Sequence, residues 1–383
     1  MSLRIGFNAQ RLAGQRLGVG RYIEYMVRHW ASRLRDDEDL TLYVRRPLEP
    51  IVTSKPARVR TVLRASRMSG IPWENLQLRR AARKDDILFC PAYTGPVFPP
   101  VKTVVATHSV TEVEPGLNTW KYKQSYSRLF ALCARQAEAV IVPSEITRES
   151  VIDYYKVRPD RVVVVPQGAD DAFRPGTSAD VLSATRTRFF GADRPYILYV
   201  GKCSARRNIP GLIEAFAILK RTHRIPHGLL LFGPNHLGLP LDEVCRKLGV
   251  MDDVVQTDGV VAKHTDLIPI YSAADVFVHP SEYEGWSMTT VEAMACGTAV
   301  VAANRGGLGE VARGHAMMVD DPTAEALAEA IGRVLEDTAL RKDLQMRARA
   351  RGEALNWTTL AGNTLEIVRN AASGSSLTQG LTP

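Results

Sequence analysis

The sequence predicts an α/β protein with two domains, each built on a mostly parallel sheet that helices cover. Apolar runs of strand length alternate with amphipathic helical runs along most of the chain, and this alternation is typical of parallel sheets. The 383 residues exceed one ordinary core and fit two domains. The alternation breaks near residues 168–195, and a fresh series begins at Tyr196.

In the first half, short apolar runs bounded by turn residues predict the strands. They are residues 3–8, 40–45, 59–63, 86–89, 102–107, 139–142 and 162–165. Helical patterns include residues 20–34, 73–82 and 122–137. The first of these helices has one predicted buried face, because its apolar residues recur at helical spacing. They are Ile23, Met26, Val27, Trp30 and Leu34.

The second half repeats the same design. Its predicted strands are residues 196–201, 228–232, 254–257, 276–279, 299–303 and 316–319. Its predicted helices are residues 210–222, 241–248, 265–273, 290–296, 324–336 and 338–354, followed by 357–371. We therefore expect domains at residues 1–190 and 191–355, a last helix within 356–372, and a loose tail at 373–383 that is rich in Ser, Gly and Thr.

The composition places the chain among globular proteins, with 45% hydrophobic and 23% charged residues. No run of 18 apolar residues occurs, so we expect no transmembrane helix. The N-terminus enters a predicted strand without a secretory h-region. The five cysteines are scattered without a C-x-x-C pair, which favours a reducing compartment and argues against a zinc site. We expect a cytoplasmic protein.

The net charge of +8 comes from the first half of the chain. Residues 1–190 carry 30 Lys or Arg against 19 Asp or Glu, whereas the remainder carries 19 against 22. The basic residues are densest at 55–84, where Met68 and Trp73 interrupt them. This pattern predicts an anionic membrane surface as a partner, with a solvated helix face as the alternative. Nucleic acid is not predicted, because no zinc knuckle, RNP-like strand or basic zipper occurs.

The most informative stretch is Glu284-Gly-Trp-Ser-Met-Thr-Thr-Val-Glu292. It joins a predicted strand to a predicted helix that stops at Gly297, so it lies at the carboxyl end of a strand, where open α/β sheets bind ligands. The two carboxylates stand about two helical turns apart. They can accept hydrogen bonds from hydroxyls at two parts of one extended ligand, such as a sugar and a ribose. The N–H groups of Gly285, Trp286, Ser287 and Met288 begin a helix, which favours phosphate.

Together with the residues that follow, EGWSMTTVEAMACGTAVV resembles the E-x7-E signature of glycosyltransferase family 4. The family form is close to E-G-F-G-L-P-x-x-E-A-M-A-C-G-x-P-V-V. This sequence departs from it at Ser287 and Thr289, where the family usually has Gly and Pro. The resemblance implies a retaining enzyme with the GT-B fold. In that fold, two Rossmann-like parallel-sheet domains face each other across a cleft, and the C-terminal helix crosses back to the first domain.

Two segments of the first half also resemble the family. Residues 14–20 form a Gly-rich loop after a strand, which allows the backbone to approach a phosphate or sugar. The loop lacks the third Gly of a dinucleotide fingerprint, and a tight turn is the alternative reading. By resemblance, Gly18 and Gly20 lie near the donor diphosphate. His108 follows a predicted strand, and by resemblance lies beside the anomeric centre, although Ser109 stands where an acid is common.

Two further segments belong to the second domain. Residues 199–208 are similar to the family form V-G-x-x-x-x-R-K-N and place Lys202, Arg206 and Arg207 at a helix start. Guanidinium groups bind phosphate by paired hydrogen bonds, so these residues are candidates for a diphosphate site. By resemblance, Gly233, Gly259 and Val260 form walls of the base pocket, with ordinary strand ends as the alternative.

The resemblance implies a hexosyltransferase that uses a nucleotide diphospho-sugar and no cofactor. Residues 1–190 would bind a saccharide or lipid-linked acceptor and residues 191–355 the donor, with GDP-mannose as the first expectation and a UDP-sugar as the second. Glu292 would bind ribose, Glu284 the sugar hydroxyls, and the basic residues would replace a metal at the diphosphate. His108, Glu284 and Arg207 are the catalytic candidates. The alternatives are a non-catalytic sugar-nucleotide-binding subunit, or another GT-B enzyme such as a phosphorylase or epimerase. The sequence predicts no oligomeric state.

Overall fold

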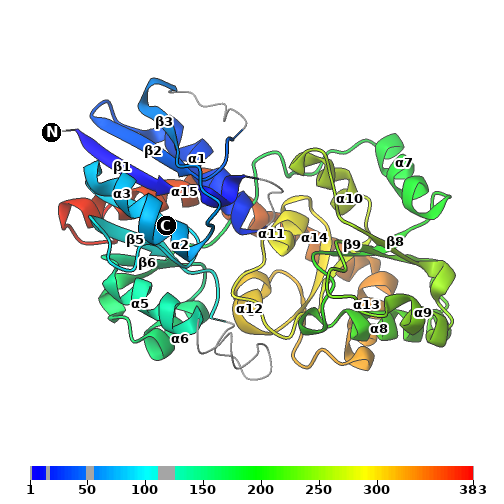
Figure 1. Ribbon diagram of the computed structural model, residues 1–383. Coiled ribbons are helices and arrows are strands. Elements are labelled where there is room, and N and C mark those ends of the chain that lie inside the picture. Colours follow the sequence, from blue (N-terminus) through cyan, green and yellow to red (C-terminus); the bar gives the residue numbers. More distant parts are fainter. Residues whose placement is uncertain (1, 14–17, 49–55, 111–125, 383) are drawn as a thin grey trace. The chain divides into compact units, whose positions relative to one another are not determined.

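The computed structural model describes residues 2–13, 18–48, 56–110 and 126–382. The chain forms two compact units, and in each of them helices cover a parallel sheet (Figure 1). Unit 1 contains Met1–Gln167 and Trp357–Pro383, and unit 2 contains Gly168–Asn356. The predicted pair of α/β domains is therefore confirmed.

Unit 1 is built on a seven-stranded sheet in the order β3-β2-β1-β4-β5-β6-β7, with every neighbouring pair parallel. Most of its strands are buried apolar runs, as expected when helices cover both faces of a sheet. The strands are β1 Leu3–Asn8, β2 Glu38–Val44, β3 Val59–Leu63, β4 Ile87–Cys90, β5 Lys102–Ala106, β6 Ala139–Val142 and β7 Val162–Val164. Each agrees with its predicted range to within two residues at either end.

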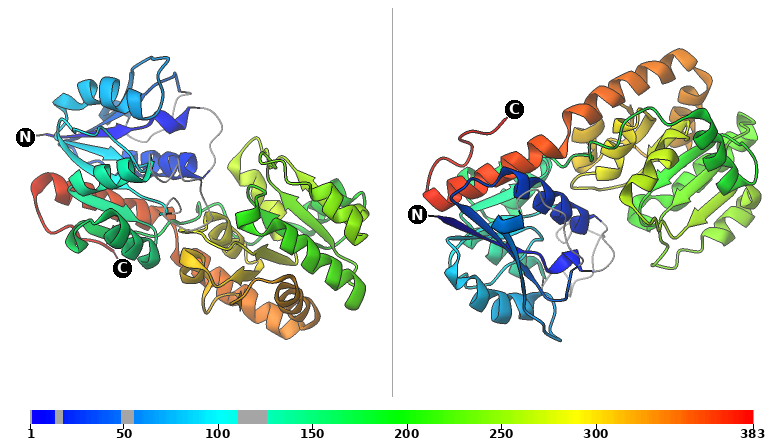
Figure 2. Two further views of the ribbon diagram at one scale, coloured as in Figure 1. Left: turned by 60° about the horizontal axis from the view of Figure 1, so that its bottom comes forward. Right: turned by 90° about the horizontal axis from the view of Figure 1, so that it is seen from above.

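The last helix of the chain, α15 (Trp357–Ser373), belongs to unit 1 and packs against α1 (Val19–Arg33). Figure 2 shows the two helices side by side, α15 in red and α1 in blue. The indole N–H of Trp30 donates to the carbonyl of Ala361 at 2.9 Å. The predicted return of the last helix to the first domain is confirmed.

A buried ion pair also ties α15 to the start of β2. The Arg369 guanidinium donates to both carboxylate oxygens of Glu38 and to the carbonyl of Arg33. Both charged side chains are less than a tenth exposed. The two parallel hydrogen bonds from the guanidinium give each oxygen of the buried carboxylate a partner, which offsets the cost of burying its charge.

The predicted helix at residues 73–82 is present, but its type changes along its length. The structure has a short α2 (Ile71–Trp73), a π-helical turn η3 (Glu74–Leu78) and a short α3 (Arg79–Ala81). The π turn is wider than an α turn. It accompanies the burial of two consecutive side chains, since Trp73 and Glu74 are both buried. The Glu74 carboxylate accepts hydrogen bonds from Asn8 Nδ2 at 2.9 Å and Gln10 Nε2 at 2.6 Å.

The other helices of unit 1 are α5 (Arg128–Gln136) and α6 (Glu145–Tyr155). Only part of the predicted helix at residues 122–137 can be compared, because residues 122–125 lie outside the described part of the chain. Helix α6 was not predicted. Its first residue follows Ser144, whose Oγ accepts a hydrogen bond from the Thr147 N–H.

Unit 2 is built on a six-stranded sheet in the order β10-β9-β8-β11-β12-β13, again with parallel pairs throughout. Its strands are β8 Tyr196–Val200, β9 Gly228–Phe232, β10 Val254–Thr257, β11 Val276–His279, β12 Ala299–Ala303 and β13 Met317–Val319. The order reverses between β8 and β11, so unit 2 has a topological switch point there. Ligands bind at such points, beyond the carboxyl ends of the strands.

The helices of unit 2 agree with most of the predicted ranges. They are α7 Ala179–Phe190, α8 Ile209–Thr222, α9 Leu241–Leu248, α10 Ile268–Ser272, α11 Met288–Ala295, α12 Gly306–Ala312, α13 Ala324–Glu336 and α14 Thr338–Ala354. Helix α12 was not predicted, because a Gly-Gly start has low helix propensity. The segment predicted as one helix at residues 265–273 is a 3₁₀ turn, η10 (His264–Leu267), that continues into α10.

The predicted domain boundary at residue 190 is wrong. Residues 168–190 belong to unit 2, and α7 packs against α10. Phe189 and Phe190 of α7 contact the rings of Phe232 and Tyr196 in the unit 2 sheet. The first and last segments of unit 2 also pair with each other, because the Ala169 N–H donates to the Leu355 carbonyl at 3.0 Å.

The predicted loose tail is also wrong over its described part. The tail folds back onto α15 as far as Thr382, and two asparagine side chains of α15 form hydrogen bonds with the tail backbone. The Asn363 amide donates to the Thr382 carbonyl at 2.8 Å and accepts from the Thr382 N–H at 2.9 Å. The Asn370 amide donates to the carbonyl of Gln379 at 2.9 Å. These hydrogen bonds supply the order that the polar composition does not predict.

We expect Arg369→Met to lower the free energy of unfolding by about 3–5 kcal/mol, because it leaves the buried Glu38 carboxylate without its cation. The double variant E38Q/R369M should recover part of this loss, since it also removes the buried charge. Urea denaturation of the full chain measures both. The control is Arg4→Met, which removes an exposed pair with Asp86 and should change nothing measurable. An R369M variant as stable as R4M would contradict the role given to this pair.

Candidate active site

The two glutamates of the E-x7-E run lie in the predicted places, in the loop after β11 and inside α11. Ser287 caps α11, and its Oγ accepts a hydrogen bond from the Thr290 N–H at 3.2 Å. A serine here satisfies one of the donors that the start of a helix leaves unpaired. Glu284 lies three residues before this cap, and Glu292 lies in the second turn of α11. The strand-loop-helix arrangement predicted for this segment is therefore confirmed.

Two arginines meet the carboxylate of Glu284, which is only 9% exposed. Arg207 Nε lies 3.2 Å from Glu284 Oε1 and Arg206 Nη1 lies 3.6 Å from it. Both arginines come from a 3₁₀ turn, η8 (Ala205–Arg207), in the loop after β8. Arg206 also donates to the Tyr283 carbonyl. The structure thus joins the predicted basic loop to the first glutamate.

The charge state of this cluster follows from its surroundings. Burial would raise the pKa of Glu284, but the Arg207 guanidinium, with His279 and Arg206, lowers it to about 2. The carboxylate is therefore ionised and acts only as a hydrogen-bond acceptor. Burial opposes the charge of Arg207, whereas Glu284 raises the pKa of Arg207 above its usual value. The site holds more cations than carboxylates, which suits an anionic ligand.

The backbone of Glu284 is held by the start of α12. The Gly307 N–H donates to the Glu284 carbonyl at 2.8 Å. Gly306 has a φ of +53°, and a Cβ there would lie 2.5 Å from the same carbonyl oxygen. A side chain at Gly306 would therefore displace the loop that carries Glu284. Sequence reasoning did not identify this glycine pair.

Lys202, the third predicted cation, is exposed in the loop after β8. The carbonyl of Lys202 accepts a hydrogen bond from the Tyr199 hydroxyl at 2.9 Å, and the Tyr199 hydroxyl accepts one from Arg207 Nη1 at 3.3 Å. Tyr199 therefore links the backbone of Lys202 to the buried arginine.

Glycines bring three strand ends of unit 2 into contact. A Cβ on Gly233 would lie 1.8 Å from the carbonyl oxygen of Gly201. A Cβ on Gly259 would lie 2.7 Å from the Gly233 Cα, and Gly259 has a φ of +66°. Side chains would separate these loops, so the glycines set the close approach of the backbones. The predicted Gly233 and Gly259 lie together with Gly201, which was not predicted, and the next predicted residue, Val260, is 65% exposed.

The second glutamate, Glu292, is 2% exposed, and side chains contact both of its carboxylate oxygens. The Tyr271 hydroxyl donates to Glu292 Oε2 at 2.8 Å, and His264 Nε2 lies 3.0 Å from Glu292 Oε1. These two residues orient the carboxylate. Sequence reasoning missed both, because neither belongs to a recognisable motif.

His108 lies in unit 1, and both nitrogens of its ring are engaged. Nε2 donates to the Pro91 carbonyl at 2.7 Å, and Nδ1 accepts from the Gln167 amide at 2.7 Å. The rings of Tyr22 and Tyr93 pack edgewise on it, with centroids 4.8 and 5.4 Å away. Burial lowers the pKa of His108 to about 4, so the imidazole is neutral near pH 7.

The predicted Gly18 and Gly20 also belong to unit 1. Gly18 immediately precedes α1 with a φ of +45°, and Gly20 is buried in the first turn of α1. The predicted loop at residues 14–17 lies outside the described part of the chain.

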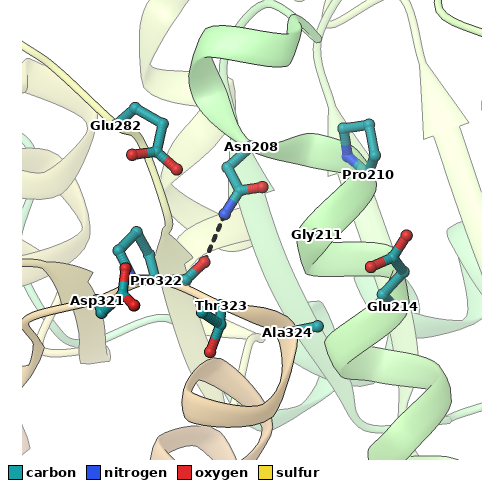
Figure 3. A pocket seen from close by; sticks show the side chains of 9 residues that line it. All are labelled: Asn208, Pro210, Gly211, Glu214, Glu282, Asp321, Pro322, Thr323 and Ala324. Carbon is teal, nitrogen blue, oxygen red and sulfur yellow. Dashed lines mark hydrogen bonds between the residues drawn. The ribbon is translucent and has the colours of Figure 1, made fainter.

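A separate pocket of about 390 Å³ lies beside the start of α8 (Figure 3). Three carboxylates line it, so it would repel a diphosphate. Within it the Asn208 amide donates to the Pro322 carbonyl at 2.7 Å. The cationic cluster around Glu284 suits an anionic donor better. The pocket is lined by Asn208, Pro210, Gly211, Glu214, Glu282, Asp321, Pro322, Thr323 and Ala324.

Family models match both halves of the chain. The model described as Glycosyltransferase Family 4 matches residues 17–173, and the model described as Glycosyl transferases group 1 matches residues 186–351. The alpha-maltose-1-phosphate synthase of Mycolicibacterium smegmatis is 30% identical over 304 residues, which cover 71% of this chain and 74% of that protein.

Other relatives are matched over less of their length. A D-inositol 3-phosphate glycosyltransferase of Kineococcus radiotolerans is 32% identical over 64% of this chain. The O-antigen chain mannosyltransferase B of Escherichia coli is 28% identical over 61% of it. The matched region spans about 60% of the length of these two proteins.

Solved structures share the fold. Sucrose-phosphate synthase from Thermosynechococcus elongatus aligns with a TM-score of 0.78 at 22% identity over 97% of this chain and 100% of that one. Anabaena HepE in complex with UDP-glucose aligns with a TM-score of 0.75 at 18% identity over 96% of this chain and 100% of that one. From these matches and the paired parallel-sheet units, the chain belongs to glycosyltransferase family 4, the glycosyl transferases group 1, and has the GT-B fold.

Proposed function

We propose that this protein is a retaining hexosyltransferase that uses a nucleotide diphospho-sugar and needs no metal. The observation that carries the proposal is the ionised Glu284 carboxylate beside Arg206 and Arg207, at the carboxyl edge of the unit 2 sheet. A carboxylate that accepts hydrogen bonds from sugar hydroxyls, next to cations that donate to a diphosphate, matches the two ends of such a donor.

The proposed donor site lies in unit 2. Arg206, Arg207 and Lys202 neutralise the diphosphate as it leaves, and charge stabilisation of this kind lowers the barrier. Arg206, Arg207 and His279 all approach Glu284 at Oε1, so we assign Oε2 to accept from the sugar. The loop residues Gly285 to Met288 line the start of α11 beside it.

The remaining donor contacts involve the nucleoside. Glu292 accepts from the ribose hydroxyls in an orientation that Tyr271 and His264 set. The strand ends at Gly233, Gly259 and Val260 face the base. Ribose binding would require the hydroxyls to share Oε1 with His264 or to displace it, because both carboxylate oxygens already have partners.

The neutral His108 does not serve as the base in this proposal. Its Nε2 proton is committed to the Pro91 carbonyl and its Nδ1 lone pair to Gln167, so we assign His108 a part in binding the acceptor within unit 1, together with Tyr93. The acceptor oxygen bonds to the anomeric carbon on the face from which the phosphate oxygen departs. The acceptor proton passes to that phosphate oxygen, and the anomeric configuration is retained.

GDP-mannose is our first donor and a UDP-sugar our second. The name of the Escherichia coli relative, a mannosyltransferase, favours the first, and the Anabaena complex with UDP-glucose favours the second. For the acceptor we propose a saccharide or lipid-linked saccharide used in cell-surface polysaccharide or glycolipid assembly.

We also propose that unit 1 binds the anionic inner face of a membrane. Met68, Leu76 and Phe98 are exposed in or near the basic segment at residues 55–84. Arg79 Nε donates to the Phe98 carbonyl at 2.8 Å, which brings a basic and an apolar residue together. No helix in the described ranges is long and apolar enough to cross a bilayer.

The first test is a thermal-shift panel of GDP, UDP, ADP and dTDP with magnesium and with a chelator. A nucleotide at 100 times its dissociation constant adds about 2.7 kcal/mol, or roughly 5–10 °C for a unit of this size. We expect one nucleotide to shift the melting temperature equally in both conditions. Lys202→Ala should weaken binding, whereas Lys247→Ala, on the exposed face of α9, should not. No shift from any nucleotide would overturn the donor site.

We expect Glu284→Gln to lower kcat about 100-fold or more, because the amide keeps the shape of the side chain but loses the charge next to Arg207. Nucleotide binding should change little. The control is Glu282→Gln, which removes an exposed carboxylate two residues away. Full turnover by E284Q would refute the assignment. A wild-type protein that binds a nucleotide but turns over no donor would favour the non-catalytic subunit instead.

Co-sedimentation with liposomes tests the membrane proposal. We expect binding to vesicles of anionic lipid and weak binding to neutral ones, with R80Q/R83Q lowering the affinity about 10-fold or more at roughly 1 kcal/mol per cation. The matched control is R246Q/K247Q, which removes two exposed cations from unit 2. Equal partitioning of the wild-type protein to both kinds of vesicle would contradict the proposal.

A further inference from the structure

His279 is the last residue of β11 and lies five positions before Glu284. It is 2% exposed, and sequence reasoning treated it only as part of a buried strand. Its ring lies between the hydroxyls at the start of α11 and the carboxylate of Glu284. We propose that His279 is a positioning residue, whose neutral imidazole couples the cap of α11 to Glu284 and fixes the orientation of that carboxylate. The inference rests on the proposed function of Glu284.

One ring nitrogen faces two hydroxyls. His279 Nδ1 lies 3.1 Å from Ser287 Oγ and 3.2 Å from Thr290 Oγ1. The two hydroxyl oxygens are 2.8 Å apart, and Ser287 Oγ also accepts from the Thr290 N–H. Each hydroxyl has one proton to donate, so this pair can bind each other and still supply a donor to Nδ1.

The other ring nitrogen faces the carboxylate. His279 Nε2 lies 3.8 Å from Glu284 Oε1, and both atoms are buried without a well-aligned hydrogen bond. An ionised carboxylate only accepts, so the proton of the neutral ring belongs on Nε2, where a lone pair would instead be repelled. The distance is longer than a hydrogen bond, and such contacts in unliganded sites tighten when substrate binds.

The surroundings keep the ring neutral and the carboxylate ionised. Burial lowers the pKa of His279, although Glu284 opposes this, and Arg207 and Arg206 add to the lowering. Arg207, Arg206 and His279 all approach the same oxygen, Oε1. Among the described residues, Oε1 has no hydrogen-bond partner in the unliganded site, and Arg207 Nε is the nearest of the three groups at 3.2 Å. When these contacts tighten, all three groups hold Oε1 and fix the direction of Oε2.

This coupling assigns a role to the hydroxyl of Ser287. The family usually has glycine at this position, which has no hydroxyl for His279 Nδ1. Ser287 caps α11 and contacts His279 with the same oxygen. Through it the loop that carries Glu284 and the helix that carries Glu292 are tied to one imidazole.

Three substitutions separate the two sides of the ring. In His279→Gln the amide nitrogen can take the place of Nε2 and donate to Glu284. In His279→Asn the shorter amide reaches only the place of Nδ1 and can bind the hydroxyls. His279→Leu removes both interactions. We expect H279Q to keep kcat within about 3-fold, and H279N and H279L to lower it about 10- to 100-fold, as loss of an orienting partner does.

In all three variants, the donor KM and the nucleotide affinity measured by thermal shift should stay within about 3-fold of wild type. His279 acts on the orientation of Glu284 and does not itself contact the nucleotide. Ser287→Ala should lower kcat in the wild-type background and have no further effect in H279L, as residues of one network do. If H279L fails to fold, the comparison of H279Q with H279N decides. Equal activity of H279Q and H279N, or full activity of H279L, would overturn the inference.

A measurement that needs no turnover separates this inference from the proposed function. In the ¹⁵N-histidine NMR spectrum, the signals missing from H279Q identify His279. We expect a neutral ring protonated on Nε2, with an Nδ1 shift that changes in S287A. A ring protonated on Nδ1, or one that S287A leaves unchanged, would overturn the inference even in an active enzyme. The expected spectrum in a protein without turnover would instead count against the proposed function alone.

Discussion

The buried ion pair between Arg207 and Glu284 is the constraint on which the rest of unit 2 depends. A carboxylate that is 9% exposed would be neutral or excluded without a cation beside it. The pair also joins two loops from neighbouring strands, β8 and β11, at the switch point of the sheet. Burial of such a pair needs supporting hydrogen bonds. Arg207 donates one to the Tyr199 hydroxyl, and the Gly307 N–H donates one to the Glu284 carbonyl, which approaches Gly306 too closely for a side chain there.

Much of this arrangement is local in sequence and was predicted for that reason. Glu284 and Glu292 share one strand-loop-helix segment, and Arg206 and Arg207 lie in the turn η8 between β8 and α8, so periodicity and spacing indicate both places. The partners of Glu292 are different. Tyr271 and His264 lie 21 and 28 positions before it in a short helix and turn, and only the packing of α10 against α11 brings Tyr271 to it. His279 was hidden for a similar reason, because one polar residue at the end of an apolar strand has no periodic signal.

The points at which the structure departs from the predictions share a physical origin in contacts that the local sequence pattern does not contain. The alternation of strand and helix patterns breaks near residues 168–195, which placed residues 168–190 in the first predicted domain. The pairing of Ala169 with Leu355 and the ring contacts of Phe189 and Phe190 assign them to unit 2. The tail is polar, yet Asn363 and Asn370 bind its backbone. The π-helical turn that begins at Glu74 accompanies a carboxylate held by Asn8 and Gln10, more than 60 positions away. No local pattern contains these contacts.

The departures at Ser287 and Thr289 can be weighed on the same physical grounds. A Gly and a Pro restrict or permit backbone angles, whereas Ser and Thr act through their hydroxyls. Here Ser287 Oγ caps α11, contacts His279 Nδ1 and lies 3.3 Å from Thr289 Oγ1. The helix still begins at Met288, and the buried Glu292 still accepts a hydrogen bond from the Tyr271 hydroxyl. Hydrogen bonds thus replace backbone restriction as the source of order in the loop, so these two residues do not by themselves argue for a non-catalytic protein.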